Sequence, residues 1–163
     1  MALTDTELAY IAGIFDGEGC INLSSNKGFA YVRVIVANTD YRIIQHFSSS
    51  FGGAVIKLKK VNEKWKDSWQ WVLSWTAAVD FLEEIYPWLI IKRHQAEAVF
   101  AFDAIRLKTK RKNDDPVREQ YLEALQLLQE QMTFLNKKGP GVDKDPLDFY
   151  LEKLNASHSR VKS

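Results

Sequence analysis

The chain has 163 residues, 46% of them hydrophobic and 12% aromatic, which is enough to build about one domain around its own core. Its 22 basic and 21 acidic residues nearly cancel, so a globally basic protein is excluded and any nucleic-acid surface must arise from local clusters. The single cysteine, Cys20, excludes an intramolecular disulfide and a cysteine-rich zinc site.

The first half of the chain is expected to contain two helices and three strands. Thr4 and Glu7 form a capping-box pattern that begins a helix over residues 5–17. Alternating residues predict strands over 20–24 and 29–37, and in the second of these Val32, Val34 and Val36 face inward. Asn38 or Thr39 is expected to cap the second helix, which ends at the glycines 52–53 before a strand over 54–60.

The second half is expected to be mostly helical. A strand over 68–75 completes a hairpin, and Thr76 begins a helix that Pro87 ends. Further helices are predicted over 91–108, from Pro116 to about residue 136, and from Asp145 onward.

The order of these elements predicts an α+β fold. An α-β-β-α-β-β-α core is expected to form an antiparallel sheet with helices on one face, followed by C-terminal helices, which leaves the other face free for a partner. We place this domain at residues 1–138 and assign 139–163 to a linker, a short helix and a polar tail. In the strand over 68–75, either the tryptophans or Gln70 faces outward, and we favour Gln70.

The end of the first helix is unusual because two acids, Asp16 and Glu18, lie at the negative end of the helix dipole. Either they are simply solvated, or a cation such as a divalent metal compensates them through Glu18 and the last carbonyls, including that of Gly17. The same helix carries small residues at a spacing that lets two helices approach closely, and we expect a dimer interface there at Ala9, Ala12, Gly13 and Asp16.

Residues 11–19, IAGIFDGEG, resemble the LAGLIDADG motif of homing endonucleases. Matches fall at Ala12, Gly13, Asp16 and Gly19, and Glu18 conservatively replaces the last aspartate. The FGG at 51–53 and the YPWLIIKRHQA at 86–96 also resemble this family, and the likeness extends over about residues 8–135. One motif in a short chain resembles the homodimeric branch, which implies a saddle-shaped antiparallel sheet in the DNA major groove.

The resemblance also implies roles for individual residues. Glu18 matches the essential metal ligand, Gly17 the position whose carbonyl faces the metal, and Asp16 a structural acid of the motif. Asn38 lies where the family often has a polar residue that orders water, while Arg42 and Lys92 lie where basic residues flank the scissile phosphate. The implied cofactor is Mg²⁺, with Mn²⁺ as a plausible replacement and Ca²⁺ as a substitute that does not support cleavage.

Polar side chains on the outward strand faces and near the turns are candidates for DNA contacts, because such groups bind base edges and phosphates. An ordinary solvated sheet face is the alternative interpretation. The candidates are Asn22, Ser24, Asn26, Lys27, Tyr31, Arg33, Lys57, Lys59, Lys66 and Gln70.

Together these patterns predict a homodimeric, site-specific endonuclease that cuts double-stranded DNA at a long pseudo-palindromic target. Two alternatives with the same fold are a maturase that binds intron RNA and a DNA-binding protein that does not cleave. No apolar run is long enough to span a bilayer and no secretory signal is visible, so we expect an intracellular protein without membrane contact. Organellar, archaeal and bacterial hosts all remain open.

Overall fold

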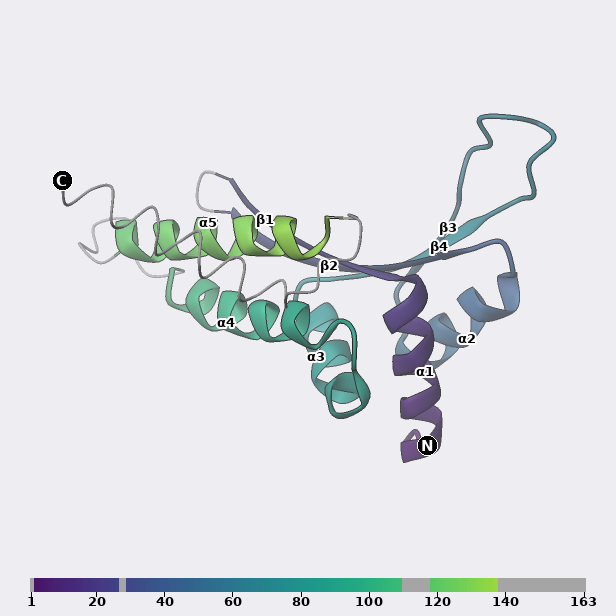
Figure 1. Cartoon of the computed structure of the whole chain (residues 1–163), viewed down its shortest axis with the longest axis horizontal. Helices are drawn as coiled ribbons and strands as arrows, with labels where there is room; N and C mark the ends of the chain where they lie inside the picture. The colour runs from purple at the N-terminus through teal and green to yellow at the C-terminus, as the bar shows by residue number, and fades with distance from the viewer. Residues whose placement is uncertain (1, 27–28, 110–117, 138–163) are drawn as a thin grey trace, which may run out of the picture.

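A computed structural model of the chain describes residues 2–26, 29–109 and 118–137 (Figure 1). The predicted α-β-β-α-β-β-α order is confirmed, and two long helices follow it. The domain boundary predicted after residue 138 and the short helix predicted from Asp145 lie outside the described residues. The elements are α1 (Asp5–Glu18), β1 (Gly19–Asn26), β2 (Phe29–Asn38), α2 (Tyr41–Phe51), β3 (Ala54–Lys57), β4 (Trp69–Ser74), α3 (Thr76–Ile85), the short 3₁₀ helix η1 (Tyr86–Trp88), α4 (Arg93–Thr109) and α5 (Arg118–Leu135).

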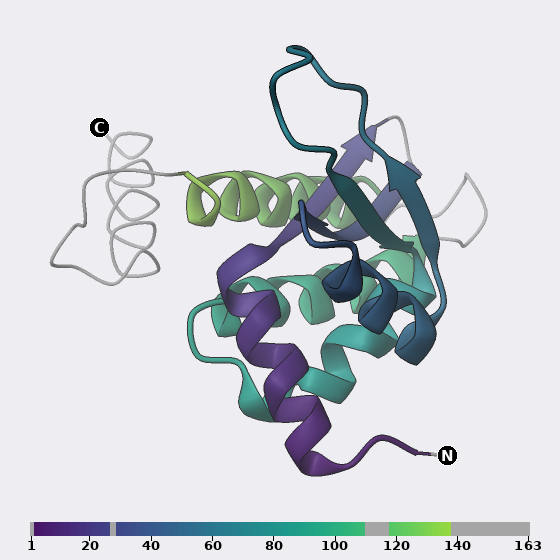
Figure 2. The same ribbon diagram turned by 90° about the vertical axis from the view of Figure 1, so that its right-hand side faces the viewer.

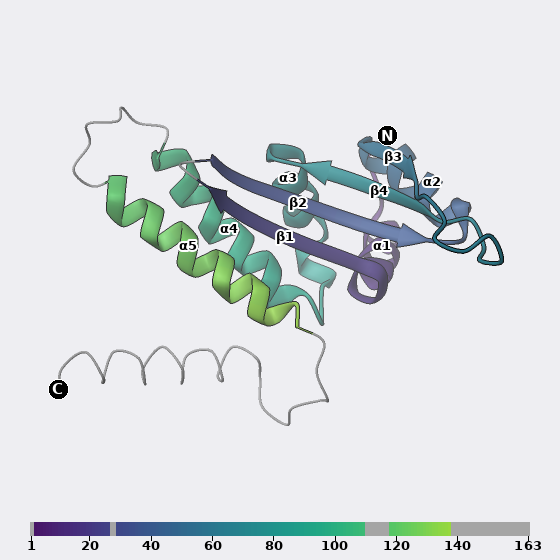
Figure 3. The same cartoon turned by 90° about the horizontal axis from the view of Figure 1, so that it is seen from above.

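The four strands form one sheet in the order β1-β2-β4-β3, and every neighbouring pair is antiparallel. Helices α1 to α4 lie on one face of this sheet (Figure 1). Seen from above, the strands lie in front of these helices and no described element covers them (Figure 3). The predicted α+β fold with one open sheet face is therefore confirmed.

The inward face of the sheet is apolar because the strands alternate as predicted. Gln70, by contrast, alternates with the buried Trp71 and shares its face with Val72, which confirms the outward orientation that we favoured. Trp71 in this strand is fully buried. Trp75, predicted to share its face, instead follows the strand as the N-cap of α3, is 45% exposed and packs edge-to-face on Tyr31. The buried inward residues of the three longer strands are Ile21, Leu23, Val32, Val34, Val36, Trp71 and Leu73.

An aromatic cluster joins the sheet to the helices below it. Trp71 and Phe81 lie 5.2 Å apart between ring centroids, and Phe15 and Phe47 extend the contacts to α1 and α2. The Trp71 indole donates a hydrogen bond of 2.6 Å to the carbonyl of Gly52. The next residue, Gly53, has φ +91°, and a Cβ there would lie 2.7 Å from the Val72 carbonyl, so the turn after α2 requires glycine.

Side-chain caps fix where the first two helices begin. The predicted capping box is confirmed, because the Thr4 hydroxyl accepts the Glu7 N–H and the Glu7 carboxylate accepts the Thr4 N–H. The predicted cap of α2 was wrong. Asp40 caps this helix by accepting the Arg42 N–H at 3.0 Å, and the Asn38 side chain stabilises the preceding turn by accepting the Asp40 N–H at 2.8 Å.

Helix α5 packs on α4 and lies along the edge strand β1 (Figure 3). At its end the Asn136 amide donates to the carbonyl of Ile21 at 2.7 Å, so this helix protects the edge of the sheet from pairing with other strands. Among the described residues, no helix combines the length and apolar character needed to cross a membrane.

Candidate active site and nucleic-acid interface

The acidic helix end lies at a corner of the sheet, where α1 leads directly into β1 (Figure 2). The Glu18 side chain is exposed at this corner. Gly19 follows it in extended conformation, and a Cβ at that position would lie 2.5–2.6 Å from Phe15. A larger residue would force β1 away from α1. Gly19 therefore allows the close contact between helix and strand that places Glu18 at this corner.

Asp16 performs a structural task at this corner. Its buried carboxylate accepts the Ile90 N–H at 2.8 Å and the Lys92 N–H at 2.9 Å. These bonds tie the end of α1 to the segment that precedes α4, more than 70 residues further along the chain. The charge of Asp16 is therefore compensated by two backbone donors of a distant segment.

Replacing Asp16 by Asn is expected to lower the free energy of unfolding by about 2 kcal/mol, because one of two backbone donors loses its charged acceptor. The measurement is chemical denaturation at neutral pH. Asp80→Asn is the matched control because Asp80 is exposed on α3. Equal stability of both variants would contradict the anchoring role.

Lys92 is held next to Asp16, in the same corner as Glu18. Its ammonium donates to the backbone carbonyl of Asp16, which is one of the last carbonyls of α1. Burial lowers the pKa of Lys92, and the negative charges of Asp16 and Glu18 oppose that shift. The structure therefore brings Lys92 and Glu18 close enough for their charges to interact.

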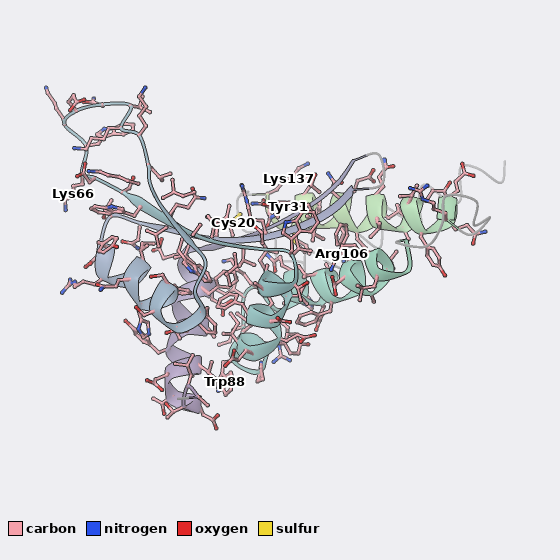
Figure 4. All side chains as sticks on the ribbon, turned by 180° about the vertical axis from the view of Figure 1, so that it is seen from behind. Cys20, Tyr31, Lys66, Trp88, Arg106 and Lys137 are labelled. Carbon is pink, nitrogen blue, oxygen red and sulfur yellow. The ribbon has the colours of Figure 1, made fainter. Side chains whose placement is uncertain are left out.

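The open face of the sheet starts at this corner and is organised in rows across the strands. Pairing aligns Ser24 with Tyr31, and it aligns Asn22 with Arg33 and Ser74. Tyr31 and Ser74 hydroxyls lie 3.1 Å apart. Figure 4 shows Tyr31 and Cys20 on the side of the sheet opposite to Trp88.

The next row of the open face is apolar across all four strands, which we did not predict. Cys20 pairs with Ile35, Ile35 with Val72, and Val72 with Ala54. Beyond it, Ala37 and Ile56 flank Gln70. We call the six apolar residues of these two rows the apolar band. They are Cys20, Ile35, Ala37, Ala54, Ile56 and Val72.

The candidate lysines of the second hairpin divide into two groups. Lys57 pairs with Trp69, lies over its ring and forms an ion pair of 2.9 Å with Asp67, so its predicted place on the open face was wrong. Lys59 and Lys66 are exposed in the loop between β3 and β4, which projects on the open side of the sheet (Figures 1 and 4). They therefore remain candidates for phosphate contacts.

Two other candidates cannot be placed. Lys27 lies outside the described residues, and only the backbone of Asn26 belongs to the described part of β1.

Comparison with known proteins resolves the family. A family model described as a LAGLIDADG-like domain matches residues 5–86, about half of the chain. The chain belongs to the LAGLIDADG family. Among curated proteins, none matches the chain significantly.

Solved LAGLIDADG structures share the fold over nearly the whole chain. The homing endonuclease I-CvuI, solved with its target and 2 mM Ca, is 25% identical; the match covers 92% of this chain and 95% of that chain, with a TM-score of 0.64. The archaeal intron-encoded homing endonuclease I-Vdi141I, solved with DNA, is 16% identical; the match covers 93% and 98%, with a TM-score of 0.65. The expected homing endonuclease fold is confirmed.

In the LAGLIDADG helix, the small residues face two directions. Ala12 is fully buried and Asp16 is 8% exposed, so both side chains pack within their own chain, and their contact with a second copy stays a prediction. Gly13 and Gly17 are exposed, and a Cβ built at either would meet nothing within 4 Å. With the partly exposed Ala9, they form an open ridge along α1.

The remaining site candidates lie at α2. The Arg42 side chain is 88% exposed, and its guanidinium bonds to the carboxylate of Asp40. This contact lowers the pKa of Asp40 to about 2. Asn38 is half-buried and engaged in the turn that precedes α2. Lys92 thus lies at the corner that contains Glu18. Asn38 and Arg42 instead form hydrogen bonds with Asp40.

The donor set at the corner fits a hard divalent cation. Glu18 supplies an exposed carboxylate and Gly17 a backbone carbonyl, and oxygen ligands of this kind suit Mg²⁺. Among the described residues of one chain, no three His, Cys, Asp or Glu side chains gather around a possible metal position. Further oxygens must therefore come from water, from a phosphate or from a second copy of the chain.

Proposed function

We propose that this protein is a site-specific, divalent-metal-dependent endonuclease that cuts double-stranded DNA as a homodimer. The observation that carries the proposal is the corner at which the exposed Glu18 and the anchored Lys92 lie next to an open sheet face. Membership of the LAGLIDADG family and the likeness to I-CvuI, which was solved with a DNA target, support it.

The residues of the corner have different roles in the proposed reaction. When bound, the divalent ion supplies an activated water and neutralises charge on the phosphate. Glu18 and the Gly17 carbonyl hold the ion at the edge of the sheet. Lys92, fixed through Asp16, places a positive charge near the phosphoryl oxygens.

Arg42 and Asn38 serve as outer residues of the same site in this proposal. The exposed side chain of Arg42 is long enough to leave Asp40 and meet a DNA phosphate. Asn38 orders water through its amide nitrogen, since its oxygen already accepts the Asp40 N–H.

A second copy completes the enzyme because one chain offers a single exposed carboxylate at the corner. The open ridge of Ala9, Gly13 and Gly17 lets two α1 helices pack closely, which brings one Glu18 from each chain toward the same point. The exposed Ile90 and Ile91 lie in the segment bonded to Asp16 and add exposed apolar side chains near the end of α1.

DNA binds on the open face in this proposal. Asn22, Arg33 and Gln70 face outward at positions where they can bind base edges in the major groove. The outward Ser24 and Tyr31 extend this surface, and Lys59 and Lys66 reach phosphates from the projecting loop.

The proposal is tested by incubating the protein with a library of randomised DNA duplexes and Mg²⁺, followed by sequencing of the cut ends. We expect ends from one long, pseudo-palindromic site. Mn²⁺ should support cutting, whereas Ca²⁺ or EDTA should abolish it. Tight binding of a structured intron RNA without any DNA cutting would contradict the endonuclease and favour the maturase.

A further inference from the structure

We infer that the apolar band reads thymine methyl groups, so that each half of the DNA target carries T·A pairs next to the cut. This inference rests on the proposed DNA-cleaving function and adds a base preference to it. It starts from the row Cys20, Ile35, Val72 and Ala54, which crosses all four strands of the open face without a single charged or amide side chain.

The side chains of the apolar band lie on the open face of the sheet and are not part of the hydrophobic core. Ile35 is 9% exposed and forms its floor, whereas the neighbouring Ile56 is 48% exposed. Val72 alternates with the core residues Trp71 and Leu73, and it therefore points away from the core. The aliphatic side chains of Ile56 and Val72 are thus presented to whatever occupies the open face.

The chemistry of the DNA major groove limits what can lie against such side chains. Each base pair presents hydrogen-bond donors and acceptors there, and the thymine C5-methyl is the apolar group among them. A guanine or cytosine edge held against Ile56 and Val72 would lose its water without gaining a partner, which costs free energy. A thymine methyl, by contrast, gains about 0.8 kcal/mol on burial, which is about a fourfold change in affinity.

The surroundings of the apolar band favour a nucleic acid over an apolar protein surface. On one side it is bordered by the row of Asn22, Arg33 and Ser74, and Gln70 lies within it between Ala37 and Ile56. The Arg33 Nε is buried without a hydrogen-bond partner among the described residues, so the row next to the band has an unused donor. The projecting loop adds exposed lysines on the same side of the sheet.

The position of the apolar band predicts where the thymines fall. Cys20 is the second residue after Glu18, so this row is nearer to the corner than the row of Asn22 and Arg33. Successive outward rows of a strand are about 7 Å apart, which matches about two base-pair steps. Thymines are therefore expected at the inner positions of each half-site, with bases read by Arg33 further out.

The test compares thymine with uracil, which lacks only the methyl group. Duplexes bound by the wild-type protein in Ca²⁺ are selected from the randomised library, and we expect T·A pairs at the inner positions. Deoxyuridine at two of those positions should weaken binding about 15-fold, the product of two fourfold losses. Deoxyuridine at outer thymines should change binding less than twofold.

Protein variants assign the effect to the apolar band. Ile56→Ala should reduce the discrimination against deoxyuridine to less than half of the wild-type ratio. Val55→Ala, on the opposite face of the same strand, should leave the ratio unchanged. Melting temperatures equal to that of the wild-type protein show that neither variant has lost its fold.

The outcomes separate this inference from the proposed function. Selection of a single cleaved site whose inner positions hold G·C pairs, or whose inner thymines tolerate deoxyuridine, overturns the inference and leaves the endonuclease in place. Unchanged discrimination in Ile56→Ala also overturns it. Failure of the wild-type protein to select any duplex refutes both.

Discussion

Glu18→Gln is expected to lower the rate of DNA cleavage by about 10³-fold or more while target affinity stays within about threefold. The amide keeps the size of the side chain but removes the negative charge that holds a divalent cation at the corner. Binding survives because the outward residues of the sheet, rather than this corner, supply most DNA contacts in the proposal. The measurement is single-turnover cleavage of the selected target in Mg²⁺, together with a binding titration in Ca²⁺.

Two further variants control this result. Glu18→Asp keeps the carboxylate one methylene shorter, and we expect it to retain measurable cleavage. Glu83→Gln removes a carboxylate from the exposed face of α3 and should leave the rate unchanged. Undiminished cleavage by Glu18→Gln would falsify the assignment of Glu18 as the metal ligand.

Gly13→Arg is expected to convert the protein into a folded monomer that no longer makes double-strand cuts. In one chain the new side chain meets no atom within 4 Å of its Cβ, and replacing a helical glycine raises helix propensity by up to about 1 kcal/mol. In a two-fold symmetric pair, the same residue lies near its own copy, so two arginines would clash and repel each other.

Sedimentation equilibrium measures the first part of this prediction, and cleavage of a plasmid that carries the target measures the second. Circular dichroism should show unchanged helix content in the variant. Ala104→Arg, on the exposed side of α4, is the matched control and should remain dimeric. A dimeric and fully active Gly13→Arg protein would exclude the α1 ridge as the interface.

Periodicity was sufficient to predict the faces of the longer strands. The alternation in β2 and β4 places Val34 and Trp71 in the core and Gln70 outside, because burial of one face dominates the energetics of a sheet covered on one side. The short edge strand β3 was different, since none of its four residues is buried. There the prediction placed Lys57 on the outward face, whereas pairing with β4 places Ile56 outward.

The acidic motif was recognisable from local sequence, but its partners were not. Asp16 bonds to Ile90 and Lys92, and no local pattern predicts a hydrogen bond between segments so far apart along the chain. For the same reason the sequence could not decide which side of α1 packs on its own chain. Ala12 and Gly13 are both small, yet only Gly13 is exposed.

The alternation of the sheet has a consequence for how such a protein changes over time. Outward residues such as Asn22, Ile56 and Gln70 lie apart from the aromatic cluster around Trp71. In the proposed endonuclease, substitutions at these positions change the preferred target with little cost in folding free energy. Under that proposal, the target sequence can change one base pair at a time while the corner at Glu18 stays the same.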